Sequence, residues 1–229
     1  MKGIPLLILT IFLFSCQTLP LINSPVSPAD EKTLTCPSPF LKEKYRLVHA
    51  IETRVAGDTR GVIIGITLAD PSTRFVSCAI MTAEGIVLFE AESGPGTLKI
   101  TRALPPFDSM DFAKNMIEDI KLIFFAPEGK IQKKGTLPDG ATACRYREEN
   151  GDLMDVITDK SEDTEIKRYS SVGVLKRQIK FYKTSGNIYQ SIELQANEEF
   201  NYSLLMTLIE AESVKSKLLK KGYSRKIKK

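Results

Sequence analysis

The sequence predicts an α+β fold in which a highly curved or one-sided antiparallel sheet packs on one amphipathic helix. The first observation is that residues 45–102 have the pattern of short strands separated by turns. Strands that follow one another this closely need hairpin connections, and hairpins make an antiparallel sheet. The second observation is one stretch of helical periodicity near residues 108–125. The chain of 229 residues is long enough for one domain with its own apolar core.

The strands are predicted from alternating apolar residues and from turn sequences. Leu47, His49 and Ile51 share one face of the strand that starts at Tyr45. The strand after the turn GDTRG has one strongly aliphatic face, made of Val62, Ile64, Ile66 and Leu68. Further strands are expected in RFVSCAIMT, IVLFEAE, TLKITRA, ATACRYRE and LMDVIT, and around residues 179 and 188–194. The last apolar stretch, YSLLMTLIEA, fits a strand or a helix, and we favour a strand because the elements before it are strands.

The helix is predicted to begin after Asp108 as its N-cap, with Asp111 placed favourably for the helix dipole, and to end before Pro127. Its apolar stripe must be buried, and the aliphatic face of the sheet is available. Sheet and stripe either fill a packed core or leave a slot for acyl chains, and both arrangements fit the sequence. The candidate ligand-binding residues of such a slot are Ile64, Ile66, Leu68, Phe112, Met116 and Ile120.

The N-terminus resembles the signal peptide of bacterial lipoproteins. The apolar run Ile4–Phe14 has eleven residues, fewer than the roughly 20 of a membrane-spanning helix. It leads into Leu13-Phe14-Ser15-Cys16, which resembles a lipobox. The resemblance implies that residues 1–15 are removed and that Cys16 receives a diacylglyceryl group and a further acyl chain such as palmitate. Gln17, where an aspartate would favour the inner membrane, implies the outer membrane, with the domain facing the periplasm.

Composition divides the rest of the chain into three parts. Residues 16–35 are predicted to form a lipidated, proline-rich tether, residues 36–214 the folded domain, and residues 215–229 a basic tail. The tail holds eight basic residues and no acidic one, so the chain before it carries −4 although the whole chain carries +4. The tail is expected either to be solvated or to lie on anionic lipid headgroups. With one aromatic residue and no folded basic face beside it, it does not indicate nucleic-acid binding.

The cysteines and the single histidine do not form a catalytic set. In an oxidising periplasm, one pair among Cys36, Cys78 and Cys144 can form a disulfide, while a buried free thiol fits Cys78 equally well. His49 lies on the apolar face of its strand, and we expect it to be packed in the core. A metal site needs several ligands and a cysteine nucleophile needs a base. The sequence therefore predicts no enzyme, no metal and no cofactor.

Residues 81–127 resemble a bacterial outer-membrane lipoprotein family related to the lipoprotein-localisation carriers LolA and LolB. A small-residue loop, Thr82 to Gly85, precedes a strand with Leu88-Phe89, and the break Leu104-Pro105-Pro106 leads to the helix closed by Pro127. The resemblance implies an unclosed half-barrel wrapped over helices, with an apolar cavity for lipoprotein acyl chains. LolB has an exposed leucine on a protruding loop that is used in membrane insertion. The loop equivalent by resemblance, Thr82 to Gly85, has no large apolar residue.

The first function hypothesis is a membrane-anchored, non-enzymatic protein that binds or transports a lipid or lipoprotein at the outer membrane. Its expected partners are the membrane, through the N-terminal acyl chains, and the acyl chains held in the apolar cavity. The alternative is a structural or assembly lipoprotein that binds a protein partner. That alternative predicts a solid core and an exposed apolar patch.

Overall fold

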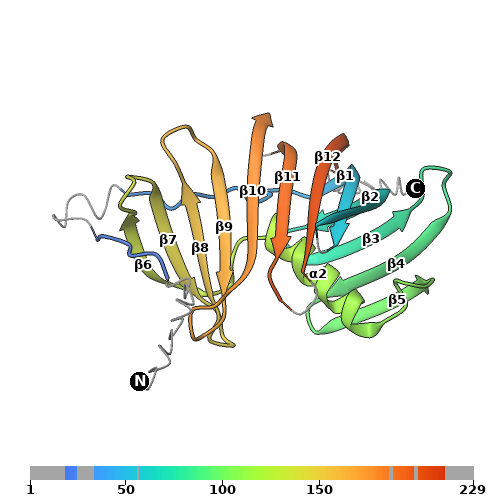
Figure 1. Ribbon diagram of the computed structural model, residues 1–229, viewed down its shortest axis with the longest axis horizontal. Helices are drawn as coiled ribbons and strands as arrows, with labels where there is room; N and C mark the ends of the chain where they lie inside the picture. Colours follow the sequence, from blue (N-terminus) through green and yellow to red (C-terminus); the bar gives the residue numbers. More distant parts are fainter. Residues whose placement is uncertain (1–18, 25–33, 56, 186–187, 199–200, 215–229) are drawn as a thin grey trace, which may run out of the picture.

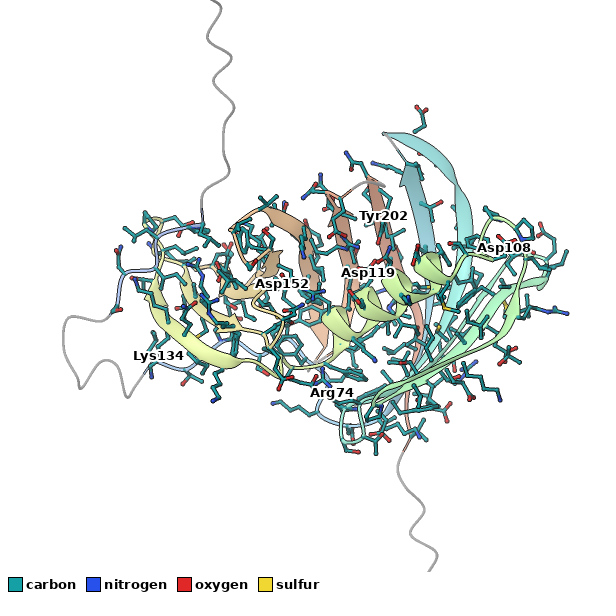
Figure 2. All side chains as sticks on the ribbon, turned by 90° about the horizontal axis from the view of Figure 1, so that it is seen from below. Arg74, Asp108, Asp119, Lys134, Asp152 and Tyr202 are labelled. Atoms are coloured by element: carbon teal, nitrogen blue, oxygen red, sulfur yellow. A yellow bond between two sulfur atoms is a disulfide. The ribbon has the colours of Figure 1, made fainter. Side chains whose placement is uncertain are left out.

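The computed structural model describes residues 19–24, 34–55, 57–185, 188–198 and 201–214. These residues form one antiparallel sheet of 12 strands and the helix α2 (Met110–Phe124) (Figure 1). The strand order is β5-β4-β3-β2-β1-β12-β11-β10-β9-β8-β7-β6, so the sheet is open, with β5 and β6 at its edges. Seen from below, the sheet curves round α2 (Figure 2).

The chain contributes the strands as two meanders joined by α2. The first meander contains β1 (Tyr45–Val55), β2 (Asp58–Asp70), β3 (Phe75–Met81), β4 (Val87–Gly94) and β5 (Thr97–Ala103). The second contains β6 (Lys130–Thr136), β7 (Thr142–Arg147), β8 (Leu153–Thr158), β9 (Thr164–Tyr169), β10 (Leu175–Ser185), β11 (Ile188–Ala196) and β12 (Tyr202–Ser213). Pairing of β1 with β12 unites them, with Tyr45 opposite Ser213 and Ile51 opposite Met206. The predicted α+β fold with a curved antiparallel sheet is confirmed.

Two strands lie where the sequence predicted none. β6 has the sequence KIQKKGT, in which lysines replace the expected apolar alternation. As an edge strand it pairs with β7 on one side and has only an isolated bridge, from Thr136 to Asn23, on the other. Lysines on an edge discourage pairing with a second chain. β9 follows the acidic loop, and its buried residues include Thr164, Ile166 and Tyr169. The stretch YSLLMTLIEA is part of strand β12, as favoured from the sequence.

The helix begins one residue later than predicted. Its N-cap is Ser109, whose Oγ accepts a hydrogen bond from the Phe112 backbone N–H at 3.0 Å. Asp108 lies just before the cap. Aspartate and serine are comparable N-caps, so two adjacent candidates are not distinguished by residue type. Asp111 lies in the first turn, as expected, and the helix ends at Phe124, before Pro127.

Residues 19–24, which we call the N-terminal strap, lie against the convex face of the sheet near β6–β8. Ile22 is 1% exposed and packs with Ala143 and Ile157, which alternate along their strands with core-facing residues. Asn23 and Thr136 exchange two backbone hydrogen bonds, at 2.8 and 3.0 Å. A Cβ on Gly135 would lie 1.9 Å from the Asn23 carbonyl oxygen, so the close crossing needs glycine there. Residues 19–24, which we expected to be part of the tether, are thus docked on the domain.

A buried ion pair lies beneath the strap. Asp155 is fully buried, and the Arg145 guanidinium donates to both of its carboxylate oxygens at 2.7 Å. Nη2 of Arg145 also donates to the carbonyl oxygen of Pro20 at 3.0 Å. Because a buried charge needs every available hydrogen bond, the strap completes the solvation of this pair. The hydrogen bond and the burial of Ile22 together hold the strap on the sheet.

A disulfide fastens the chain on the opposite, concave side of the same strands. Cys36 is bonded to Cys144 with a Cα–Cα distance of 5.6 Å, and Cys144 pairs across β7 and β8 with the core residue Val156. The chain then contributes the buried Leu41, whose N–H donates to the Phe124 carbonyl at 3.1 Å. Cys78 is a buried free thiol, one of the two states that its strand position allowed.

Candidate functional site

The concave face of the sheet and α2 enclose the main apolar core (Figure 2). Ile120 is 9% exposed, while Phe112 and Met116 are half-buried against the same core. The Phe112 ring lies edge-on to Phe89 and Phe107, with centroid distances of 5.7 and 5.1 Å. Edge-to-face contact is a favoured geometry for aromatic pairs. The three helix residues predicted for the site therefore lie together on the sheet side of α2.

The aliphatic face of β2 lies on the convex side of the sheet, away from α2. Leu47 and Thr67 form a cross-strand pair and are both buried in the core, whereas Val62 is 59% exposed. The structure therefore does not bring Ile64, Ile66 and Leu68 together with the helix residues, contrary to our expectation. On the concave side of a curved sheet the side chains converge, so small residues fit best there. A Cβ on Gly65, for example, would lie 2.6 Å from Cδ1 of Ile51.

A second set of apolar residues faces the core instead. They belong to β1, β2 and β5, remain partly open to solvent and pack against the same core as the helix. With the two half-buried helix residues they form what we call the inner apolar surface: Ile51, Ile63, Leu98, Ile100, Phe112 and Met116. Ile51 shares the core-facing side of β1 with Leu47 and His49, as its alternation predicts. Ile63 lies on the side of β2 opposite to the aliphatic face and thus faces the core as well.

A small cavity lies between the C-terminal end of α2 and the sheet. Leu47, His49, Ile123 and Phe124 help to line a cavity of about 10 Å³. This is room for about one water molecule and not for an acyl chain. At this end of α2 the structure has the packed core, whereas the inner apolar surface beside the N-terminal half of the helix stays partly open to solvent. Acyl-chain binding at the C-terminal end of α2 would therefore require the helix to move away from the sheet.

His49 is part of this packing. Its side chain is 2% exposed and its ring centroid lies 6.2 Å from that of Phe124. Burial disfavours the charged imidazolium and lowers the pKa of His49 to about 4. The residue is therefore neutral at neutral pH and packed in the core, as predicted.

A buried polar network pins the middle of α2 to the sheet. Asp119 accepts a hydrogen bond from Nε of Arg177 on β10 at 2.9 Å and another from the Tyr202 hydroxyl on β12 (Figure 2). Nη1 of Arg177 donates to Glu198 at 2.6 Å. Burial raises the pKa of the Asp119 carboxyl, and the nearby Arg177 charge opposes that rise. The helix is thus fixed by charge at its middle, while its N-terminal half is held by the half-buried Phe112 and Met116.

A polar cleft of about 440 Å³ lies at the C-terminal end of α2, beside the turn between β7 and β8. Two of its cations form ion pairs: Arg74 contacts Glu128 at 2.9 Å, and Arg168 contacts Glu148 at 2.9 Å. Burial, and secondly the Arg74 charge, lower the pKa of Lys121. The lining thus combines three cations with four glutamates and forms a network of ion pairs with one carboxylate in excess, which no sequence pattern indicated.

Several predicted features lie outside the described residues. They are Cys16, the signal sequence and the basic tail, and the lipidation and membrane contacts expected of them remain predictions. Within the described ranges, no group of three or more His, Cys, Asp or Glu side chains is arranged to hold a metal ion. Nor does that part of the chain contain a helix long and apolar enough to cross a membrane.

The structure also shows apolar side chains on the surface, including the aliphatic face of β2 that we expected to be buried against the helix. The turn before β4 ends in Ile86, which is 57% exposed and directly follows the Thr82 to Gly85 loop. On the convex face, side chains of β2 and β12 form what we call the outer apolar patch: Val62, Ile64, Ile66, Leu68, Leu205 and Ile209. Val62, Leu205 and Ile209 are 59%, 39% and 58% exposed.

Comparison with solved structures confirms the fold. A LolA-superfamily protein from Nitrosomonas europaea is 11% identical and superposes with a TM-score of 0.51 over 77% of this chain and 88% of its own. A putative outer membrane lipoprotein-sorting protein domain from Vibrio parahaemolyticus is 9% identical, covering 82% of this chain and 91% of its own with a TM-score of 0.43. No protein-family model and no curated protein matches the sequence. The similarity to the LolA-superfamily structure is one of the open, curved fold.

Proposed function

We propose that this protein is a non-enzymatic lipoprotein, anchored through Cys16 at the outer membrane, that binds acyl chains of a lipid or lipoprotein on its inner apolar surface. The observation that carries the proposal is the half-buried state of that surface. Ile51 and Ile63 on the sheet, with Phe112 and Met116 on α2, remain partly open to solvent. Each methylene transferred from water to such a surface contributes about 0.8 kcal/mol.

The unequal attachment of α2 supports a way for an acyl chain to enter. The Asp119–Arg177 pair and Tyr202 hold the middle of the helix, and breaking them exposes a buried charge. The N-terminal half lacks such bonds to the sheet in the described contacts beyond apolar packing of Phe112 and Met116. Outward movement of that half would open the inner apolar surface, and an entering chain would replace the lost apolar contacts.

The covalent structure supports an extracytoplasmic location. A disulfide between Cys36 and Cys144 persists in oxidising compartments such as the periplasm, and an anchor at Cys16 would place the domain there. The test is Cys16→Ala in the expressed chain. We expect the protein to lose acylation and cleavage at this site, with intact mass and envelope fractionation as the measurements. A wild-type mass and unchanged cleavage would contradict the anchor.

A matched pair on β2 tests the binding surface. Ile63 and Ile64 are adjacent, and both are half-buried, but only Ile63 belongs to the inner apolar surface. In titrations of the soluble chain from Gln17 onward with a fluorescent fatty acid, Ile63→Gln should weaken binding about tenfold, corresponding to about 1.4 kcal/mol. Ile64→Gln should leave the affinity close to wild type. Equal losses in both variants, or no binding by the wild-type domain, would contradict acyl binding at this surface.

The outer apolar patch favours a second function, the assembly of a protein partner. An exposed apolar patch is a feature expected of a structural or assembly lipoprotein, and the outer apolar patch fits that expectation. Crosslinking in cells from a photoreactive residue at Val62 would identify such a partner. Ala83, on the exposed Thr82 to Gly85 loop, gives a matched control position. Recovery of no Val62-specific adduct would count against this function.

A further inference from the structure

Two large aliphatic side chains lie exposed on the turn between β9 and β10. Val172 is 84% exposed and Val174 is 61% exposed, on either side of Gly173. The turn is closed by hydrogen bonds: the N–H of Gly173 donates to the Ser170 carbonyl at 2.9 Å, and the N–H of Ser170 donates to the Val174 carbonyl at 2.8 Å. The valines are therefore presented by an ordered, hydrogen-bonded turn.

The N-terminal strap begins beside this same turn. A Cβ on Gly173 would lie 3.3 Å from Cγ of Leu19, so the first residue of the strap is in contact distance of the turn. The strap then continues through Pro20, held by Arg145, to the buried Ile22. Leu21, between these two residues, is 65% exposed. The chain thus reaches the folded domain at the two valines.

The distance from this contact to Cys16 is short. Only Gln17 and Thr18 separate Cys16 from Leu19 in the sequence. Three Cα–Cα steps of about 3.8 Å span at most about 11 Å. The headgroup layer on each side of a bilayer is about 5–8 Å thick, from the difference between the total and the hydrocarbon thickness. A domain acylated at Cys16 therefore has the turn at the membrane surface, whereas a free tether of residues 16–35 would have allowed it to swing.

We infer that the β9–β10 turn inserts Val172 and Val174 into the bilayer that holds Cys16 and so fixes the orientation of the domain. This inference rests on the Cys16 anchor of the proposed function. The contact is apolar and not electrostatic, because the nearby cations are already paired. Lys176 contacts Asp152 at 3.0 Å, and Arg168 contacts the same carboxylate at 3.4 Å.

The absence of tryptophan from the sequence allows a direct test. The acylated, full-length mature chain carrying Val172→Trp is reconstituted in phosphatidylcholine vesicles, with and without lipid brominated on the acyl chains. Val62→Trp is the matched control, since Val62 is also strongly exposed but lies on β2, in the other meander. Tryptophan favours membrane interfaces, and we expect brominated lipid to quench Val172→Trp about twofold more than Val62→Trp. Val174→Trp should behave like Val172→Trp.

The intact mass of each sample separates the inference from the anchor on which it rests. Full acylation with equal quenching at Val172→Trp and Val62→Trp would overturn the inference and leave the proposed anchor intact. A mass without acyl chains would overturn the anchor. In that case, selective quenching of Val172→Trp with added vesicles would still support the turn as a membrane-contact surface, and its loss would overturn the inference as well.

Discussion

Lowering the pH should destabilise this fold through His49. Burial lowers the pKa of His49 from its ordinary 6.5 to about 4 in the folded protein. As the pH falls below 6.5, the unfolded chain takes up a proton that the folded protein does not, so protonation favours unfolding. The contribution to stability is therefore complete above pH 6.5 and is lost progressively down to about pH 4. Between pH 7.5 and pH 5 the loss is about 2 kcal/mol, from the two pKa values and linkage.

The assay is urea unfolding of the soluble domain at pH 7.5 and pH 5, for the wild type and for His49→Phe. Carboxylates also titrate over this range, but they do so in both proteins, so the difference between the two pH dependences isolates His49. We expect the wild type to lose about 2 kcal/mol more than His49→Phe between the two pH values. Equal pH dependences would refute the reasoning, because the imidazole would then titrate alike in the folded and unfolded states.

Three further perturbations test other parts of the fold. Cys144→Ser should lower the free energy of unfolding by about 2–5 kcal/mol in denaturant titrations, while Cys78→Ala should cost less because Cys78 is not cross-linked. Asp119→Ala should cost about 3–5 kcal/mol in the same assay, because the buried Arg177 charge then keeps only the partly exposed Glu198 as a carboxylate partner. Gly135→Ala should raise hydrogen exchange in the strap, since its Cβ would collide with the strap backbone; unchanged exchange would contradict the close crossing.

The sequence predicted those elements whose local pattern agrees with their place in the fold. Apolar alternation in β1 and the stripe of Phe112, Met116 and Ile120 gave the strand, the helix and its buried side. The sequence did not indicate which face of β2 is turned toward the core. Its large side chains lie on the convex face and its small ones on the concave face, the reverse of what the apolar pattern predicts. That arrangement follows from the curvature of the whole sheet, which pairing of β1 with β12 helps to set.

The strap shows a second limit of local pattern. Residues 19–24 have no periodicity, and a proline within them is typical of a linker. They form hydrogen bonds with Arg145 and Thr136 and cross closely over Gly135, which has no side chain. All three residues are far from the strap in the sequence. Such contacts become visible only when the strands are placed side by side. The disulfide has the same character, since the spacing of three cysteines does not define a pair.

The most direct test of acyl binding is to locate a bound chain on the protein. Cells that express the full chain are fed a fatty acid with a terminal diazirine and are then irradiated. The adducts are mapped by tandem mass spectrometry, and the lipids attached to Cys16 are identified separately. We predict adducts on the inner apolar surface, at Ile51, Ile63, Phe112 or Met116. Adducts confined to the outer apolar patch, or none beyond the N-terminal lipids, would contradict the proposal that this protein holds acyl chains between α2 and its sheet.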